Sequence, residues 1–377
     1  MKIISLNPEL TFNDVLLLPN FSDFTMTEDT QKTNIKTKIS KNLEIDIPIC
    51  SSPMPNISET KMAIALGKIG GIAFIHCFQN FAKQLQQVKE IKKHHVKVAV
   101  SVSDFSPAGL KHVSNLLKLK TDLICIETAH GFNSETIRFL KEIKKKHPNS
   151  QVSVSLVVTA KATQALIDAG ADSIRVGIGG GSHCTTRLVT GVGRPQLSAV
   201  LDCYKIAKKY GVPIISDTGI EHAGDIAKVI AFGASVVMIG GLFAGTDECP
   251  GPIINKNGQN YKFSAGMCSD QTQYQPPSAS KDYIKQIKSI IKKIIHYSPR
   301  QNENFVSTYS QPFRFTHEGV SGLIPYKGSV VPIIRELIGG LKRSMWYLGC
   351  ENLNEIRKKT EIVVVTPNTT RDNIPRI

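Results

Sequence analysis

Eight short runs of apolar, mostly β-branched residues recur between residues 47 and 241, and each is followed by a segment whose apolar residues have helical spacing. Strands that are apolar at nearly every position must be buried on both faces, as in a parallel sheet covered by helices. The predicted strands are 47–52, 71–76, 97–102, 123–128, 151–158, 173–178, 213–217 and 235–241. Eight such βα units predict a parallel (β/α)8 barrel, the TIM-barrel fold, because an open doubly wound sheet usually has fewer strands.

The remaining segments fit one catalytic domain that spans residues 1–377. A strand is expected at 261–265, and a long flap insertion follows strand eight at 267–317. Within this insertion, residues 281–296 have the pattern of a basic amphipathic helix. Helices at 331–348 and 351–359 and a strand at 362–366 are predicted to close the chain.

Composition limits the compartment and the partners. The formal net charge is +15, but the lysines fall at helical spacings without interleaved aromatic residues, so we expect a solvated basic surface and neither a nucleic-acid nor a membrane partner. Such a surface still attracts small anionic ligands. The eight cysteines form no CxxC pair. With neither a secretion signal nor an apolar run of membrane-spanning length, a reducing cytoplasm is the expected location.

The most informative loop is 177–187, with the sequence GIGGGSHCTTR directly after the sixth strand. Its glycines permit positive φ angles and allow the backbone to approach an ion or a phosphate closely. Cys184 lies among polar residues that can activate a thiol, which indicates a covalent nucleophile. The alternative at this point is a flexible glycine-rich loop whose thiol happens to be exposed.

Chemistry in a (β/α)8 barrel is carried by the loops that follow the strands. Gly219, Gly240 and Gly241 follow strands seven and eight, where backbone amides commonly bind phosphate, so a phosphate ester is the expected ligand. Asp217 ends strand seven and can accept hydrogen bonds from a ribose. It can also be the N-cap of the helix that follows, and this alternative stays open here.

Taken together, these loops resemble the IMP dehydrogenase and GMP reductase family. The resemblance extends from Leu10 to Gly349, and its most specific segments are 177–187, 191–196, 214–219, 244–251, 318–320 and 325–328. It implies a barrel enzyme, assembled as a homotetramer, that acts on the purine ring of a nucleoside monophosphate with a nicotinamide cofactor. The regulatory two-repeat module of the dehydrogenases, the CBS-type module, is expected to be absent because residues 93–96 lead straight into the third strand.

The resemblance also implies residue roles. Cys184 would attack C2 of the purine, Thr186 would activate water or ammonia, and Asp270 falls where reductases carry a catalytic carboxylate. The implied substrate contacts are Ser52, Met54, Ser182, Asp217, Gly219, Gly240, Gly241, Gly266, Met267 and Glu318. The implied cofactor contacts are Glu127, Thr128, Ala129, Gly177 and Gly179, and the carbonyls of Gly179, Gly181 and Cys184 would hold a potassium ion.

Three functions are compatible with the sequence. The first is NAD-dependent oxidation of IMP to XMP through a thioimidate on Cys184. The second is NADPH-dependent reduction of GMP to IMP and ammonia by the same adduct. The third is a catalytically weak or inactive nucleotide-binding paralogue, suggested by departures from the family pattern at Pro55, Leu156 and Thr218 and by the absence of a recognisable Arg-Tyr pair in the flap. We expect the dehydrogenase.

Overall fold

The computed structural model describes residues 7–25, 32–269, 317–367 and 369. At its centre lies a closed barrel of eight parallel strands in sequence order, with the last strand pairing with the first. Its strands are β4 (Ile49–Ser51), β5 (Ile72–Ile75), β6 (Val98–Val102), β7 (Leu123–Ile126), β8 (Val152–Val157), β9 (Ser173–Val176), β10 (Ile214–Asp217) and β11 (Val236–Ile239). The predicted (β/α)8 barrel is therefore confirmed.

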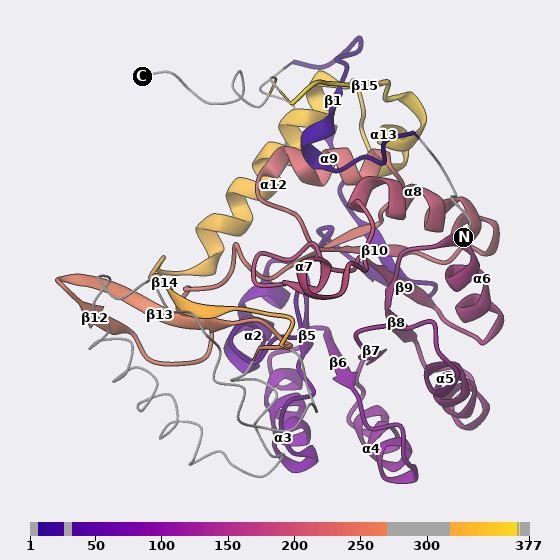
Figure 1. Cartoon of the computed structure of the whole chain (residues 1–377), viewed down its shortest axis with the longest axis vertical. Coiled ribbons are helices and arrows are strands. Elements are labelled where there is room, and N and C mark those ends of the chain that lie inside the picture. Colours follow the sequence, from indigo (N-terminus) through magenta and orange to yellow (C-terminus); the bar gives the residue numbers. More distant parts are fainter. Residues whose placement is uncertain (1–6, 26–31, 270–316, 368, 370–377) are drawn as a thin grey trace.

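Helices surround the barrel one after another as the chain runs (Figure 1). They are α2 (Thr60–Lys68), α3 (Phe81–Lys92), α4 (Pro107–Lys118), α5 (Ser134–Lys146), α6 (Ala160–Asp168), α8 (Gln196–Ala207), α9 (Ala223–Ala231) and α12 (Val330–Tyr347). Several begin at a residue whose side chain accepts a hydrogen bond from the first turn, as Asn80, Ser106 and Asn133 do. These caps satisfy amide groups that the helix itself cannot satisfy. No helix in the described part of the chain is both long and apolar enough to cross a bilayer.

Buried apolar side chains form an inner and an outer cluster. The outer cluster joins the barrel strands to the surrounding helices. The inner cluster contains alternate strand residues such as Cys50, Phe74 and Cys125 together with Ile39 and Ile45. The last two come from a hairpin, β2 (Thr37–Ser40) and β3 (Leu43–Ile45), that the sequence analysis did not predict. These apolar residues pack with buried polar side chains such as Arg175 and Ser155, so the barrel interior is a solid core.

The β2–β3 hairpin identifies which end of the barrel is open to ligands. Thr37 Oγ1 donates to the carbonyl of Ser235 at 3.0 Å, and the amide of Lys41 donates to the carbonyl of Asp172 at 3.1 Å. Ser235 and Asp172 immediately precede β11 and β9. The hairpin therefore covers the end where the strands begin, and the loops that carry chemistry lie at the opposite end.

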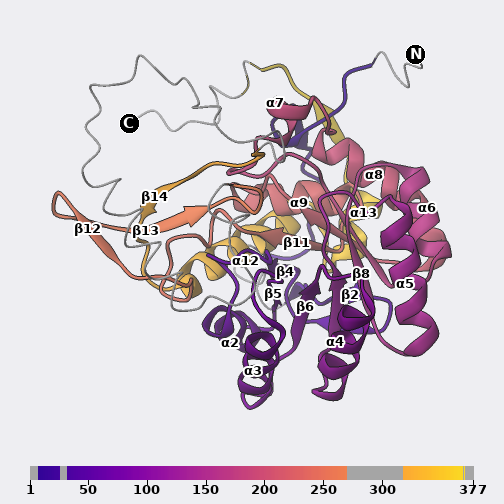
Figure 2. The same cartoon turned by 60° about the horizontal axis from the view of Figure 1, so that its bottom comes forward.

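A second sheet is built from the region after β11. It consists of β12 (Ile254–Lys256), β13 (Gln259–Ala265) and β14 (Ser321–Pro325), paired antiparallel, and it projects from one side of the barrel (Figures 1 and 2). The strand expected at 261–265 lies within β13, but β14 was not predicted. Asp270 and the helix expected at 281–296 lie outside the described residues.

Segments near the two ends of the chain pair with each other beside helix α9. A 3-10 turn, η1 (Phe12–Asp14), leads into β1 (Val15–Leu17), which pairs antiparallel with β15 (Ile362–Val364). Helix α13 (Leu353–Lys359) precedes β15, and a short 3-10 turn, η2 (Lys208–Tyr210), follows α8. The helices and strand predicted for the end of the chain are thus present, within a few residues of the expected limits.

Candidate active site

The cysteine loop lies between β9 and the short helix α7 (Thr186–Thr190). Within it, the amide of Cys184 donates to the carbonyl of Gly181 at 2.9 Å, which turns the chain so that residue 184 begins the approach to α7. Cys184 is half-buried, and its Sγ lies 3.1 Å from Thr186 Oγ1. The two residues predicted to carry covalent chemistry and proton transfer are therefore in direct contact.

Arg187 holds the loop in this shape. Its Nε donates to the carbonyl of Ile178 at 3.1 Å, and its Nη2 donates to the carbonyl of Arg194 at 2.6 Å. The Arg187 side chain also occupies the space that a Cβ on Gly179 would need, because such an atom would lie 2.5 Å from Arg187 Cγ. The glycine at 179, with φ of +76°, is thus required both by the backbone conformation and by the close approach of this arginine.

Backbone hydrogen bonds join the cysteine loop to the segments that carry Gly266 and Glu318, two of the predicted substrate contacts. Cys184 pairs antiparallel with Gly319, and the amide of Thr185 donates to the carbonyl of Glu318 at 2.9 Å. On the other side of this segment, the amide of Gly266 donates to the carbonyl of Val320 at 2.9 Å. Gly266, Met267 and Glu318 are therefore brought to the edge of the cysteine loop.

Cys268 is a further thiol on these hydrogen-bonded segments. The amide of Glu318 donates to the Cys268 carbonyl at 3.1 Å. Burial raises the pKa of the Cys268 thiol, and the nearby Glu318 and Cys184 raise it further. At neutral pH the Cys268 thiol is consequently protonated, which makes it a poorer nucleophile than a thiolate.

His183, which precedes Cys184 in the chain, is half-buried, and burial lowers the pKa of its imidazole.

Residues predicted to contact the substrate gather at the end of β11. A Cβ built on Gly241 would lie 2.7 Å from Ser182 Oγ, and one built on Gly240 would lie 3.2 Å from Met54 Sδ and 3.4 Å from Ser52 Cβ. Ser52, Met54 and Ser182 therefore converge on these two glycines, where an added side chain would crowd them. Gly219 has φ of +82° and packs against the ring of Phe12.

A buried arginine links the two predicted ribose contacts. Arg175 is 1% exposed, and its Nη2 donates to Asp217 Oδ2 at 2.6 Å while its Nη1 donates to Glu127 Oε2 at 2.5 Å. Burial alone would lower the pKa of the guanidinium, but the two carboxylates raise it well above its ordinary value, so the arginine stays charged. One cation thus positions two carboxylates that come from different strands.

The Glu127 carboxylate retains capacity for a ligand. Glu127 Oε2 accepts from Arg175 and, at 2.9 Å, from Ser101 Oγ, whereas Glu127 Oε1 is buried and has no hydrogen-bond partner among the described residues. A buried carboxylate oxygen in this state is costly unless a ligand supplies a donor.

The alternative role of Asp217 as a helix N-cap is wrong, because α9 begins at Ala223 with His222 as its N-cap.

The other predicted cofactor contacts differ in how tightly the structure holds them. Thr128 Oγ1 bonds within its own loop, to the backbone of His130, and Ala129 is exposed. Gly177, with φ of +147°, lies so close to β10 that a Cβ would be 2.0 Å from the carbonyl of Asp217. Gly177 is therefore needed for the packing of the loop against the neighbouring strand.

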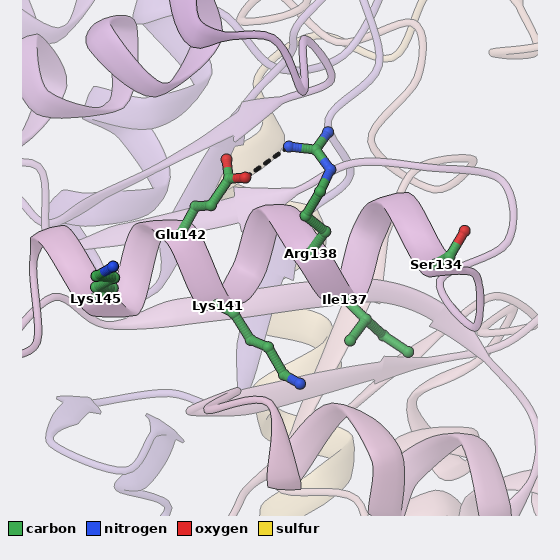
Figure 3. A pocket seen from close by; sticks show the side chains of 6 residues that line it. All are labelled: Ser134, Ile137, Arg138, Lys141, Glu142 and Lys145. Atoms are coloured by element: carbon green, nitrogen blue, oxygen red, sulfur yellow. Dashed lines mark hydrogen bonds and ion pairs between the residues drawn. The ribbon is translucent and has the colours of Figure 1, made fainter.

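A hollow of about 540 Å³ lies away from these residues, on the outside of the barrel (Figure 3). It is lined entirely by α5, with Arg138 and Glu142 pointing toward each other and joined by an ion pair. Its lining residues are Ser134, Ile137, Arg138, Lys141, Glu142 and Lys145. None of them is a predicted site residue, and the hollow is a feature of an exposed helix surface.

Comparison with known proteins identifies the family to which this barrel belongs. The model of the IMP dehydrogenase / GMP reductase domain matches residues 9–375. The chain belongs to this family. The match confirms the resemblance and the predicted enzyme class, an oxidoreductase of the IMP dehydrogenase and GMP reductase type.

Some of the relatives are named as IMP dehydrogenases and another as a GMP reductase. An inosine-5'-monophosphate dehydrogenase of Cryptosporidium parvum is 34% identical, with 97% of this chain and 94% of that protein covered. One from Borreliella burgdorferi is 32% identical over 97% of this chain and 96% of its own length. A GMP reductase of Onchocerca volvulus is also 32% identical, over 98% of this chain and 94% of its own. Overall identity therefore does not select one reaction.

Proposed function

We propose that this protein oxidises IMP to XMP with NAD, using Cys184 as a covalent nucleophile. The observation that carries the proposal is the contact of 3.1 Å between Cys184 Sγ and Thr186 Oγ1 in a loop that also brings Ser182 to Gly241. A thiol activated by a hydroxyl neighbour, next to a phosphate cradle, suits attack on a ring carbon of a bound nucleotide. The dehydrogenase relatives are consistent with this direction, as the GMP reductase relative is with the reverse one.

The proposed sequence of events assigns a task to each element of the site. Ser182, Gly240 and Gly241 bind the phosphate, and Asp217 binds the ribose, so that C2 of the purine lies against Cys184. The Cys184 thiolate then forms a bond to C2. NAD, held by the residues described below, would supply the acceptor for the hydride that C2 must lose. Thr186 Oγ1 then accepts a hydrogen bond from a water molecule that attacks the thioimidate carbon. The water proton passes to solvent, XMP is released and the thiolate is regenerated.

The residues proposed to hold the cofactor fit that task. The unpartnered Oε1 of Glu127 can accept a hydrogen bond from a ribose hydroxyl, while Arg175 fixes the orientation of the carboxylate through Oε2. We further propose that the carbonyls of Gly179, Gly181 and Cys184 hold potassium, since carbonyl oxygens suit hard monovalent cations. A homotetramer in the cytoplasm, with one barrel domain per chain and no CBS-type module, completes the proposal.

GMP reduction with NADPH is the second candidate, favoured by the similarity to a GMP reductase over nearly the whole chain. It uses the same Cys184 adduct, with ammonia as the leaving group. Asp270, the residue proposed to assist it, lies outside the described residues.

One experiment separates the two reactions. Purified protein with potassium is incubated with IMP and NAD in one cuvette and with GMP and NADPH in another, and the absorbance of the reduced nicotinamide is followed. A rise in the first supports the dehydrogenase, and a fall in the second supports the reductase. Silence in both, with purine nucleotide binding intact, would mean that the chain is the inactive paralogue.

A further inference from the structure

His183 lies in the chain between Ser182, which is proposed to bind the phosphate, and the nucleophile Cys184. Its imidazole is hydrogen-bonded to Ser182. The Nδ1 atom of His183 lies 3.1 Å from Ser182 Oγ. That hydroxyl in turn lies over Gly241, at 2.7 Å from the position that a Cβ there would take. His183 is thus one hydrogen bond removed from the proposed phosphate position.

The backbone of His183 is held from two sides. Its carbonyl accepts a hydrogen bond from the amide of Val320 at 2.9 Å. A Cβ built on Gly266 would lie 2.9 Å from the His183 carbonyl oxygen and 3.3 Å from His183 Cβ. His183 therefore packs directly against the end of β13. Because both contacts fix the backbone and Cβ of His183, the direction of its side chain is restricted.

The chemistry of the Ser182–His183 pair depends on which atom donates. A serine hydroxyl has one proton, and it can be donated either to the imidazole or to a phosphate oxygen, but not to both. If Nδ1 carries a proton and donates it to Ser182 Oγ, the hydroxyl proton is free for the phosphate. If Nδ1 is unprotonated, it accepts that proton and competes with the ligand.

We propose that His183 is a positioning residue of the phosphate site: its Nδ1–H donates to Ser182 Oγ and turns the hydroxyl proton toward the phosphate of the bound nucleotide. The inference rests on the proposed function in one respect, that the ligand is a phosphate ester bound over Gly241. It assigns His183 a role in affinity for the phosphate and no part in the bond formed by Cys184.

The test compares a nucleotide with its nucleoside. Dissociation constants for IMP and inosine are measured by calorimetry for the wild type, His183→Ala and His183→Asn. We expect His183→Ala to weaken IMP binding by about tenfold, equivalent to ~1.4 kcal/mol, with inosine binding unchanged. His183→Asn retains an N–H close to the position of Nδ1, so it should recover most of the lost affinity.

A double-mutant cycle gives the role its sharpest check. In a Ser182→Ala background the imidazole has no hydroxyl to direct, so adding His183→Ala should change IMP affinity no further. Equal losses for IMP and inosine would indicate a merely structural histidine and overturn the proposal, as would additive effects of the two changes. A wild type that binds IMP no tighter than inosine has no phosphate site, which would contradict the proposed function as well. A ratio of IMP affinity to inosine affinity that is the same in His183→Ala as in the wild type would overturn this inference alone.

Discussion

Replacement of Arg175 by methionine tests whether the buried cation holds the barrel mouth together. The change keeps an unbranched side chain but removes the hydrogen bonds to Asp217, Glu127 and Ser155. Removing one partner from a buried ion-pair network leaves uncompensated charge and costs about 3–5 kcal/mol. We therefore expect Arg175→Met to lower the free energy of unfolding by an amount in that range.

The assay is denaturant unfolding at a fixed protein concentration, with an exposed arginine as the matched control. Arg138 pairs with Glu142 on α5 at 2.7 Å, and their side chains are 50% and 40% exposed. Arg138→Met should cost only about 0–1 kcal/mol, because exposed pairs are screened by water. A triple variant, Arg175→Met with Glu127→Gln and Asp217→Asn, removes all three charges and should recover part of the stability.

The account of Arg175 would be refuted if Arg175→Met cost no more than Arg138→Met. It would also be refuted if the triple variant were less stable than Arg175→Met, because the destabilisation would then come from lost packing and not from the carboxylates left behind.

Two further predictions concern stability. Thr218 is a β-branched residue at φ of +108°, a backbone conformation that strains such residues by about 1–3 kcal/mol, so Thr218→Gly should raise the free energy of unfolding by about 1 kcal/mol in urea titrations; an unchanged or lower value would argue against strain at this position. Burial would raise the pKa of Glu59, but hydrogen bonds from His76 and Lys83 outweigh it and lower the pKa to about 2, so Glu59 stabilises the fold above pH 4.5 and that stabilisation is lost as the pH falls from 4.5 to about 2. Glu59→Gln should therefore flatten the pH dependence of the unfolding midpoint in this window, and a curve identical to that of the wild type would contradict the assignment.

The sequence predicted the barrel well because its signals are local and repeated. Strands that are apolar throughout and helices with a regular apolar stripe are visible in single segments. The β2–β3 hairpin was missed because its strands, Thr37–Ser40 and Leu43–Ile45, are short and because three of the four residues of the first strand are polar. Strand β14 was missed because its residues are only partly buried and it is identified by pairing with β13, 56 or more residues earlier in the chain (321 − 265 = 56).

The site was predicted in part. Cys184, Thr186, Ser182 and Asp217 stand out because glycines and polar residues end otherwise apolar strands. Arg175 was not singled out, although a charged residue within the buried run of β9 is a signal that sequence alone contains. Its role could not be read from the sequence, since its partners on β10 and after β7 lie 42 and 48 residues away and become neighbours only when the barrel closes.

The measurement that tests the central claim most directly is detection of the covalent adduct. Protein is mixed with IMP and NAD, quenched in acid and digested, and the peptide that contains residue 184 is examined by mass spectrometry. Cys268→Ser is the matched control, because it removes the neighbouring thiol and leaves Cys184 in place. We predict a purine nucleotide attached to Cys184 in the wild type and in Cys268→Ser, and neither adduct nor turnover in Cys184→Ala. Turnover that persists in Cys184→Ala, or an adduct found on Cys268, would contradict the account.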